Sequence, residues 1–310
     1  MKDEAHVFGG QWTVKKLAIL SQYLTAYTKA LSKMSFEKGY IDAFARTGQR
    51  KSSSDAKFDE LEERRRKIGS GQPNLPDLVP AAADAEQVQQ FLDGSARVAL
   101  QCDPAFDNYV FIEKNRARCE ELERLKDVFP DKASKISINC GDANTQIQNM
   151  CNKNWERHRA VLFLDPYGTE VSWKTIETIA ETKAIDLWVL FPLGGVNRML
   201  TQSGDINPRW RNRLNELLGT TEWYEHFYRI HSSPSLFGEQ IEHVAKAETE
   251  VISEYFLKRL GHCFAGVAPN PAILRNSKNS PLYLFCFAAG NSRGAPIALN
   301  IASHILKMGS

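Results

Sequence analysis

The sequence predicts an α/β fold with a mostly parallel sheet. Short apolar segments alternate with segments of helical period from residue 94 to residue 192. Such alternation is typical of parallel strands joined by helices. Several of the apolar segments lead straight into an acidic residue, as in "RAVLFLDPYG" at 159–168. The hydrophobic content of 43% and the charged content of 25% are ordinary for a globular chain of 310 residues.

The first predicted element is an amphipathic helix over 11–32, because Leu17, Leu20 and Leu24 recur at steps of three and four. A strand follows within 38–48, and Gly48 lies in the turn after it. The segment "GSARVAL" at 94–100 is predicted to be part of the packed domain again, after a polar stretch at 49–90. Further strands are predicted at 108–115, 135–144, 160–168 and 184–192, and helices at 116–128, 145–156 and 172–183, the last with Ser172 as N-cap.

The pattern is looser after Pro192. We expect short helices within 196–228 and a longer helix over 239–260, so that 196–260 forms a helical insertion. Two strands at 262–268 and 281–289 are joined by a short polar connection, which favours an antiparallel pair. A final amphipathic helix is predicted over 294–307. The whole chain, 1–310, is expected to form one domain.

Residues 49–90 are predicted to be a mobile insertion into the first strand–helix–strand unit. Asp42 and Glu113 lie 113 − 42 = 71 positions apart, whereas such a unit needs only about 30 residues. The basic run at 64–67 fits either a solvated helix end or a phosphate-binding patch. The insertion would serve as a lid, a substrate arm or a partner surface.

Net charge, cysteine spacing and the length of apolar runs limit the classes of protein to which the chain can belong. The formal net charge of +2 and the pI of about 8.1 neither require nor exclude a nucleic-acid partner. The six cysteines form no C-x-x-C pair, so we expect reduced, mostly buried thiols in a cytoplasmic protein and no metal site. No signal-peptide pattern is present, and no apolar run reaches the roughly 18 residues that span a bilayer.

An acidic residue stands at the end of each of three successive predicted strands. In an open parallel sheet, ligands bind beyond the carboxyl ends of the strands. Glu113 could accept hydrogen bonds from ribose hydroxyls, or it could simply begin a helix whose dipole favours an acid. Asp142 could accept from an adenine amino group, or it could be the N-cap of the next helix.

Asp165 comes directly after five apolar residues and therefore needs a hydrogen-bond donor. That donor is either structural or the amino group of a substrate. Pro166 stiffens the turn, and Tyr167 offers a flat face on which a ring could stack. The three residues together have the chemistry of a pocket that accepts an amine. Lys15 is a candidate for a charged contact near this site, although an exposed helical lysine is the alternative.

The segments "YIDAFARTG", "VFIEKN", "INCGDAN" and "FLDPYG", in this order, resemble the motifs of class I S-adenosylmethionine-dependent methyltransferases. The sequence is more similar to one subgroup, the three-Cys-motif partner (TcmP) proteins. That similarity lies in "QWTVKKLAILSQYLTAY", "GSARVAL", the segment at 165–200 and "AAGNSRGAPIALNIASHIL". It covers nearly the whole chain, and 165–200 is its most specific part.

The resemblance implies a Rossmann-like methyltransferase fold with a seven-stranded sheet and S-adenosylmethionine as cofactor. It implies ribose contact by Glu113, adenine contact by Asp142 with Ala143, and contact with the methionine part by a set at the first strand end: Asp42, Phe44, Ala45, Thr47 and Gly48. "DPYG" is similar to the D-P-P-Y motif of enzymes that methylate exocyclic amines of bases, so Asp165, Pro166 and Tyr167 would hold the substrate amine. A nucleic acid or another nucleobase compound would be the substrate.

One departure from the family pattern gives an alternative. Arg46 stands where a glycine is usual, and glycine permits close backbone approach to a ligand. The alternative is therefore a non-catalytic or conditionally active partner of a three-Cys-motif, radical-SAM-like protein, which would bind through 49–90 or 196–238. A nicotinamide-dependent oxidoreductase is a weaker reading, because no G-x-G-x-x-G follows the first strand.

Overall fold

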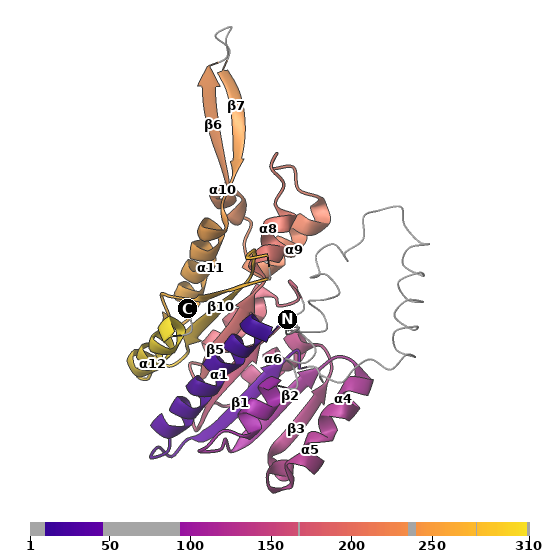
Figure 1. Cartoon of the computed structure of the whole chain (residues 1–310), viewed down its shortest axis with the longest axis vertical. Coiled ribbons are helices and arrows are strands. Elements are labelled where there is room, and N and C mark those ends of the chain that lie inside the picture. The colour runs from indigo at the N-terminus through magenta and orange to yellow at the C-terminus, as the bar shows by residue number, and fades with distance from the viewer. Residues whose placement is uncertain (1–9, 46–93, 167, 235–239, 277, 309–310) are drawn as a thin grey trace, which may run out of the picture.

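The computed structural model describes residues 10–45, 94–166, 168–234, 240–276 and 278–308. Its centre is a mixed sheet of eight strands in the order β3-β2-β1-β4-β5-β10-β8, with β9 paired to β10 beside this path (Figure 1). The predicted α/β class with a mostly parallel sheet is confirmed, although the sheet has eight strands rather than seven.

Five strands run parallel to one another and form the body of the sheet. They are β1 (Glu37–Ala43), β2 (Asn108–Glu113), β3 (Ile136–Cys140), β4 (His158–Leu164) and β5 (Ile185–Phe191). β1 pairs with β2 on one side and with β4 on the other. The chain therefore winds outward in one direction and then returns to β1 to continue in the other, which makes the β1–β4 junction the switch point of the sheet.

The antiparallel part lies at the C-terminal edge. β10 (Pro281–Ala289) is antiparallel to β5, and its antiparallel pairing with a strand inside 262–268 is the pair that the sequence predicted. That strand is β8 (Gly266–Val267), and β10 also pairs with β9 (Ala272–Arg275). The connection predicted as short and polar thus contains a third strand, because Ala272 and Leu274 are buried against β10.

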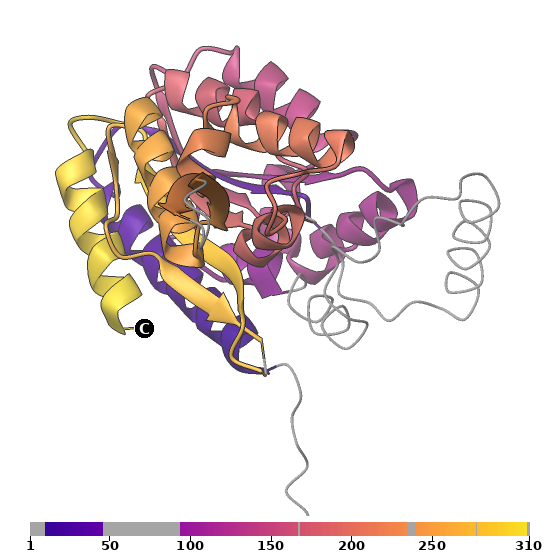
Figure 2. The same cartoon turned by 90° about the horizontal axis from the view of Figure 1, so that it is seen from above.

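Helices cover both faces of the sheet (Figure 2). One face carries α1 (Gly10–Ala30), the helical residues 94–100 and α12 (Ala295–Met308). The other face carries α6 (Ala143–Cys151), α7 (Trp173–Glu181), α8 (Leu193–Met199), α9 (Pro208–Leu218), α10 (Trp223–Phe227) and α11 (Thr249–Cys263). The helix predicted over 116–128 is two, α4 (Arg116–Glu123) and α5 (Leu125–Val128), before a 3-10 turn at Pro130–Lys135.

The helix predicted over 239–260 is wrong in its first third. A hairpin of β6 (Tyr228–Pro234) and β7 (Gln240–Lys246) precedes α11, so 196–260 is not wholly helical. The segment 240–263 is rich in Glu, Ala and Lys, which favour helices. Pairing with β6 outweighs that preference over the first seven residues, because strand formation depends on a partner that local propensity does not register.

Two buried polar contacts hold α1 against the sheet. The hydroxyl of Tyr23 donates to Asp186 Oδ2 over 2.8 Å, at the start of β5. Asp186 Oδ1 accepts from the backbone N–H of Gly290 over 3.0 Å, and burial raises the pKa of this carboxyl to about 6. Seven residues earlier on α1, Lys16 contacts Asp165 at the end of β4. The helix is therefore attached to the sheet at two points, one at the amino end of β5 and one at the carboxyl end of β4.

The expectation that all the cysteines are reduced is wrong for one pair. Cys119 of α4 and Cys140 at the end of β3 form a disulfide, with their Cα atoms 6.1 Å apart. No local motif announces this pair, because the two residues are 21 positions apart and meet only when β2 and β3 pair. Cys102, Cys151, Cys263 and Cys286 are free thiols.

Within the described ranges, every helix is too short or too polar to cross a bilayer. The same residues contain no cluster of three or more His, Cys, Asp or Glu side chains able to hold a metal ion. Residues 49–90, and with them the predicted insertion, lie outside the described part of the chain.

Candidate functional site

The candidate site lies at the carboxyl edge of the sheet, around the switch point between β1 and β4. Asp42 near the end of β1 pairs with Phe163 near the end of β4, one position before Leu164 and two before Asp165. Because side chains alternate across a strand, Asp42 and Asp165 project toward the same face, the one covered by α1. Glu113 ends β2, and Asp142 follows β3 by two residues. The structure thus brings the predicted acids to one edge.

Asp165 has a structural donor. Lys16 Nζ lies 3.1 Å from Asp165 Oδ2, and the two side chains are 1% and 12% exposed. The ammonium group also lies 5.5 Å from the centroid of the Phe163 ring, within the range of a cation–π contact. Burial lowers the pKa of Lys16 to about 8, although Asp165 and Asp42 act in the opposite direction. Of the two alternatives for the Asp165 donor, a structural one is therefore present.

Asp42 is the second buried carboxyl of this group. Its Oδ2 accepts from the Tyr40 hydroxyl over 3.3 Å, whereas Oδ1 is buried and has no hydrogen-bond partner among the described residues. Burial raises the pKa of Asp42 to about 7, and Asp165 adds to the rise. The nearby Ser95 hydroxyl, Tyr40 and Lys16 oppose it. Asp42 Oδ1 and the Ser95 hydroxyl are thus two neighbouring buried polar groups, which can pair with each other or with a polar ligand.

The end of β1 turns sharply. Phe44 was expected to continue the strand, but β1 ends at Ala43 and Phe44 has a φ of 68°. Bulky residues rarely adopt this left-handed conformation, and such strain is concentrated at functional sites. The buried Ala45 then donates its N–H to the carbonyl of Ile112 in β2 over 2.8 Å. Arg46, Thr47 and Gly48 lie outside the described residues.

Glu113 is buried at the end of β2. Its Oε1 accepts from the backbone N–H of Asn115 over 2.7 Å, and Asn115 is in turn the N-cap of α4. Its carbonyl accepts from the backbone N–H of Gly141 over 2.9 Å. The carboxyl is therefore held in a fixed orientation at the sheet edge, rather than lying free on the surface as the first residue of a helix would.

Asp142 has the role of an N-cap. Its Oδ1 accepts from the backbone N–H of Thr145 over 3.0 Å and from the Thr145 hydroxyl over 3.1 Å, while Ala143 is buried as the first residue of α6. Ser172 is likewise the N-cap of α7, as predicted, and accepts from the N–H of Thr175. The capping role of Asp142 is observed, and the residue is exposed to solvent.

The loop after Asp165 is held by side chains from two helices. Gly168 has a φ of 73°, which favours glycine, and it allows the chain to turn after Pro166 and Tyr167. Asn144 at the start of α6 donates to the carbonyl of Glu170 over 2.9 Å and accepts from the N–H of Ser172 over 3.0 Å. Tyr167 itself lies outside the described residues.

From α9, Arg213 Nε donates to the hydroxyl of Thr169 over 3.1 Å. Asn144 Oδ1 also accepts from the Thr175 hydroxyl over 2.7 Å. The loop residues 169–172 are thus fixed to α6, α7 and α9.

Sequence reasoning missed Lys16 and Asn144. It named Lys15 instead, but the apolar period of α1 could have identified Lys16, which shares the buried stripe with Leu20, Tyr23 and Leu24 at steps of four, seven and eight. Asn144 gave no sequence signal beyond its place in "GDAN". Tyr40 and Trp173, which lie close to the site in sequence, are buried core residues.

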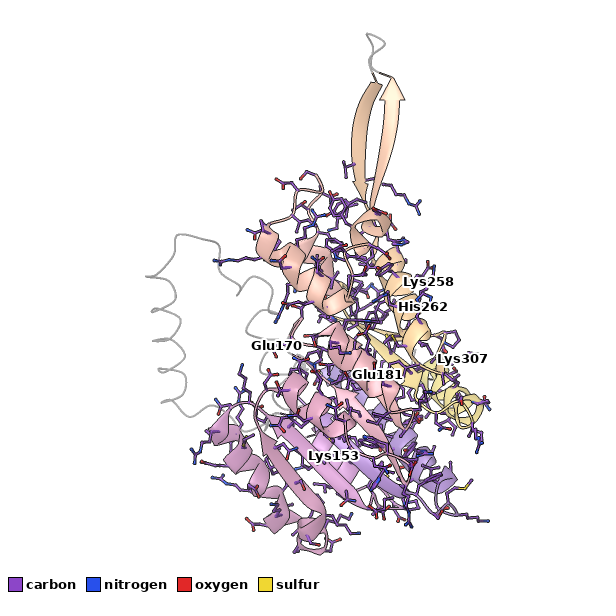
Figure 3. The ribbon with its side chains drawn as sticks, turned by 180° about the vertical axis from the view of Figure 1, so that it is seen from behind. Lys153, Glu170, Glu181, Lys258, His262 and Lys307 are labelled. Atoms are coloured by element: carbon purple, nitrogen blue, oxygen red, sulfur yellow. A yellow bond between two sulfur atoms is a disulfide. The ribbon has the colours of Figure 1, made fainter. Side chains whose placement is uncertain are left out.

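The described residues also form an open cavity of about 400 Å³ at the opposite end of the sheet. It is lined by residues such as Lys153 after α6, Arg159 at the start of β4 and Glu181 at the end of α7. Figure 3 shows Lys153 and Glu181 together with Glu170, which belongs to the loop at the carboxyl edge. None of the predicted site residues lines this cavity, so we place the candidate site at the carboxyl edge instead.

No protein-family model matches the chain, and no curated protein matches it. Among solved structures, it is similar to protein LPL1258 from Legionella pneumophila str. Philadelphia 1, described under DUF519. That match has a TM-score of 0.39 and 16% identity, and it covers 83% of this chain and 94% of that chain. It is also similar to a protein titled "Putative methyltransferase yhhF" from Escherichia coli. That match has a TM-score of 0.25 and 12% identity, and it covers 74% of this chain and 86% of that chain. Scores this low carry no argument about function.

Proposed function

We propose that this protein is an S-adenosylmethionine-dependent methyltransferase that methylates an exocyclic amine of a nucleobase. The observation that carries the proposal is the row of carboxylates at one sheet edge: Asp42, Glu113, Asp142 and Asp165. An acidic edge repels the pyrophosphate of a nicotinamide or flavin cofactor. It suits a cofactor that has a net positive charge, ribose hydroxyls and amino groups.

The buried Oδ1 of Asp42 supports this fit. Among the described residues the Ser95 hydroxyl lies near enough to compete for it, and an ammonium group of a ligand is a stronger donor for a carboxylate. Glu113 would hold the ribose, Asp142 with Ala143 would bind the adenine, and Phe44, Ala45, Thr47 and Gly48 would line the remainder. When bound, the cofactor supplies an already reactive methyl group, so the chain's own task is positioning.

Asp165, Pro166 and Tyr167 would carry out that positioning for the substrate. The carboxyl of Asp165 is 12% exposed, and its Oδ1 has no hydrogen bond within the described part of the chain. This oxygen would accept a hydrogen bond from the substrate amine, while Lys16 stays on Oδ2. Asn144, Arg213 and Gly168 act as positioning residues for the turn.

Calorimetry with S-adenosylmethionine tests the cofactor half of the proposal. We expect binding by the wild-type chain and a loss of about tenfold or more in Glu113→Ala, because a hydrogen-bonded carboxylate contact contributes about 1.5–3 kcal/mol. The matched control is Glu120→Ala, since Glu120 is exposed on α4 next to the site. No heat of binding at millimolar cofactor would refute the proposal.

The second candidate is a methyltransferase-like partner of a three-Cys-motif, radical-SAM-like protein. The Lys16–Asp165 ion pair favours it, since the donor that Asp165 requires is already supplied within the chain. Absence of cofactor binding, together with a stable salt-independent complex with a three-Cys-motif protein, would establish this candidate over the first.

A further inference from the structure

The region between the candidate site and the β6–β7 hairpin contains the basic helix α9. Its sequence, PRWRNRLNELL, holds three arginines and one glutamate, and its first turn has no acidic residue. Arg209 and Arg211 are exposed, and Arg213 is partly exposed. The whole chain has a formal net charge of only +2, whereas α9 by itself holds three arginines against one glutamate, so this short helix is a local basic feature of the described surface.

One side of α9 contacts the loop of the candidate site. Arg213 lies four residues after Arg209, so both side chains lie on the same side of the helix. Arg213 Nε donates to the Thr169 hydroxyl, and its Nη1 lies 3.1 Å from Glu216 Oε2. Arg209 therefore stands one turn from the residue that holds the substrate loop.

The other side of α9 contacts α10, the short helix that leads into the hairpin. The guanidinium carbon of Arg211 lies 4.5 Å from the centroid of the Tyr224 ring. The Tyr224 ring lies 4.7 Å from that of Tyr228, the first residue of β6. Tyr224 is partly exposed, so an arginine and an aromatic face lie next to each other on the surface between α9 and β6.

The hairpin projects from the molecule as a two-stranded ribbon (Figure 1). Among the described elements it packs mainly within itself and against α10. A lone two-stranded ribbon is only marginally stable in water, so its projection is more useful for contact with a partner than for support of the sheet. A ribbon of this kind has the width to enter a nucleic-acid groove.

We propose that α9 and the base of the β6–β7 hairpin bind the phosphate backbone of a nucleic-acid strand and direct one of its bases to Asp165. This rests on the proposed function and specifies its substrate as a polynucleotide rather than a free nucleoside. Arginines supply the charge that phosphates require, and Tyr224 supplies a ring on which a base can stack. The path crosses α9, from Tyr224 and Arg211 on one side of the helix to Arg209 and Arg213 on the side that contacts the loop.

Fluorescence anisotropy with labelled single-stranded RNA, single-stranded DNA and duplex DNA tests the proposal on the full chain. We expect binding of at least one of these, with an affinity that falls as salt rises from about 50 to about 200 mM. Arg209→Gln with Arg211→Gln should weaken it about tenfold and reduce the slope of log affinity against log salt by about two. The preferred strand identifies the substrate as RNA or DNA.

The matched control is Lys258→Gln with Lys307→Gln, which removes the same charge from exposed positions on α11 and α12 (Figure 3). It should leave the affinity within about twofold, because these lysines lie off the path. If the arginine double variant melts at a lower temperature, Arg209→Gln alone decides, since the Arg209 side chain is exposed and makes no described contact.

Two results would overturn the inference: no binding of any strand at low salt, or equal weakening by the arginine and lysine variants. A salt-independent protein complex that the arginine variants abolish would also overturn it, because the surface would then recognise a protein. Calorimetry with S-adenosylmethionine on the same sample distinguishes failure of this inference from failure of the proposed function. Cofactor binding without nucleic-acid binding refutes only the inference, and the reverse refutes only the methyltransferase.

Discussion

Lys16 Nζ and Asp165 Oδ2 lie 3.1 Å apart and join the N-terminal helix to the end of β4, across 149 positions of sequence. Lys16 is almost fully buried, so its charge depends on the carboxylates around it. The pair connects the first helix of the described chain to the residue that the sequence placed at the centre of the site. The stability of the fold and the geometry of the site are therefore coupled.

We predict that Lys16→Met destabilises the protein by about 3 kcal/mol, because it leaves the carboxyl of Asp165 without its partner. Urea unfolding measures this difference. The double variant Lys16→Met with Asp165→Leu should recover part of the loss, since no unpaired charge remains. Lys29→Met, on the exposed end of the same helix, should change stability by less than about 0.5 kcal/mol. If Lys16→Met were as stable as the wild type, the buried ion pair between Lys16 and Asp165 would not contribute to stability.

A pH dependence follows from Asp42, whose pKa is raised to about 7 by burial. Between its unfolded pKa of about 4 and its folded pKa, the folded state binds more protons than the unfolded state. The stability contributed by the neutral carboxyl is therefore complete below about pH 4 and is lost as pH rises toward 7. Asp42→Asn should thus gain stability relative to the wild type across this range, by a few kcal/mol in order of magnitude.

Urea unfolding of the wild type and of Asp42→Asn at several pH values checks this prediction. The exposed Asp205→Asn serves as control, and its difference from the wild type should change little over the same range. A difference between Asp42→Asn and the wild type that does not vary with pH would show that Asp42 is ionised in the folded protein at acidic pH.

Asn144→Ala should release the loop after Asp165. The side chain of Asn144 makes hydrogen bonds to Glu170, Ser172 and Thr175, so its loss should cost about 2 kcal/mol. Hydrogen exchange of the backbone amides at 168–172 should become faster, while that of β4 stays slow. Asn149→Ala, at an exposed position on the same helix, should leave the exchange of the loop unchanged.

The disulfide between Cys119 and Cys140 gives a prediction that chemistry can check directly. A peptide map without reductant should recover these two cysteines linked and the four free thiols alkylated. Because the bridge closes a loop across 21 positions, dithiothreitol or Cys140→Ser should lower stability by about 3 kcal/mol. Reductant should have no further effect on Cys140→Ser, and full alkylation of Cys119 in the native wild type would exclude the bridge.

Much of the fold could be predicted because it depends on local pattern. The strands β2 to β5 and the helices α1, α6, α7 and α12 follow apolar periods that repeat within a few residues. The Ser172 cap was predicted for the same reason, since a cap bonds a backbone group three residues away. The hairpin was missed because β7 acquires its structure from pairing with β6, which outweighs a composition that favours a helix.

The α/β alternation and the acids at the strand ends can be read from local sequence, because each depends on residue type and on a period of a few residues. Which side chains meet those acids depends on how distant segments pack. Lys16 reaches Asp165, Asn144 reaches Glu170, and Cys119 reaches Cys140. Each pair joins segments that are distant in the chain and adjacent in the folded sheet, and the burial that sets the charge of Lys16 and Asp42 exists only once those segments pack.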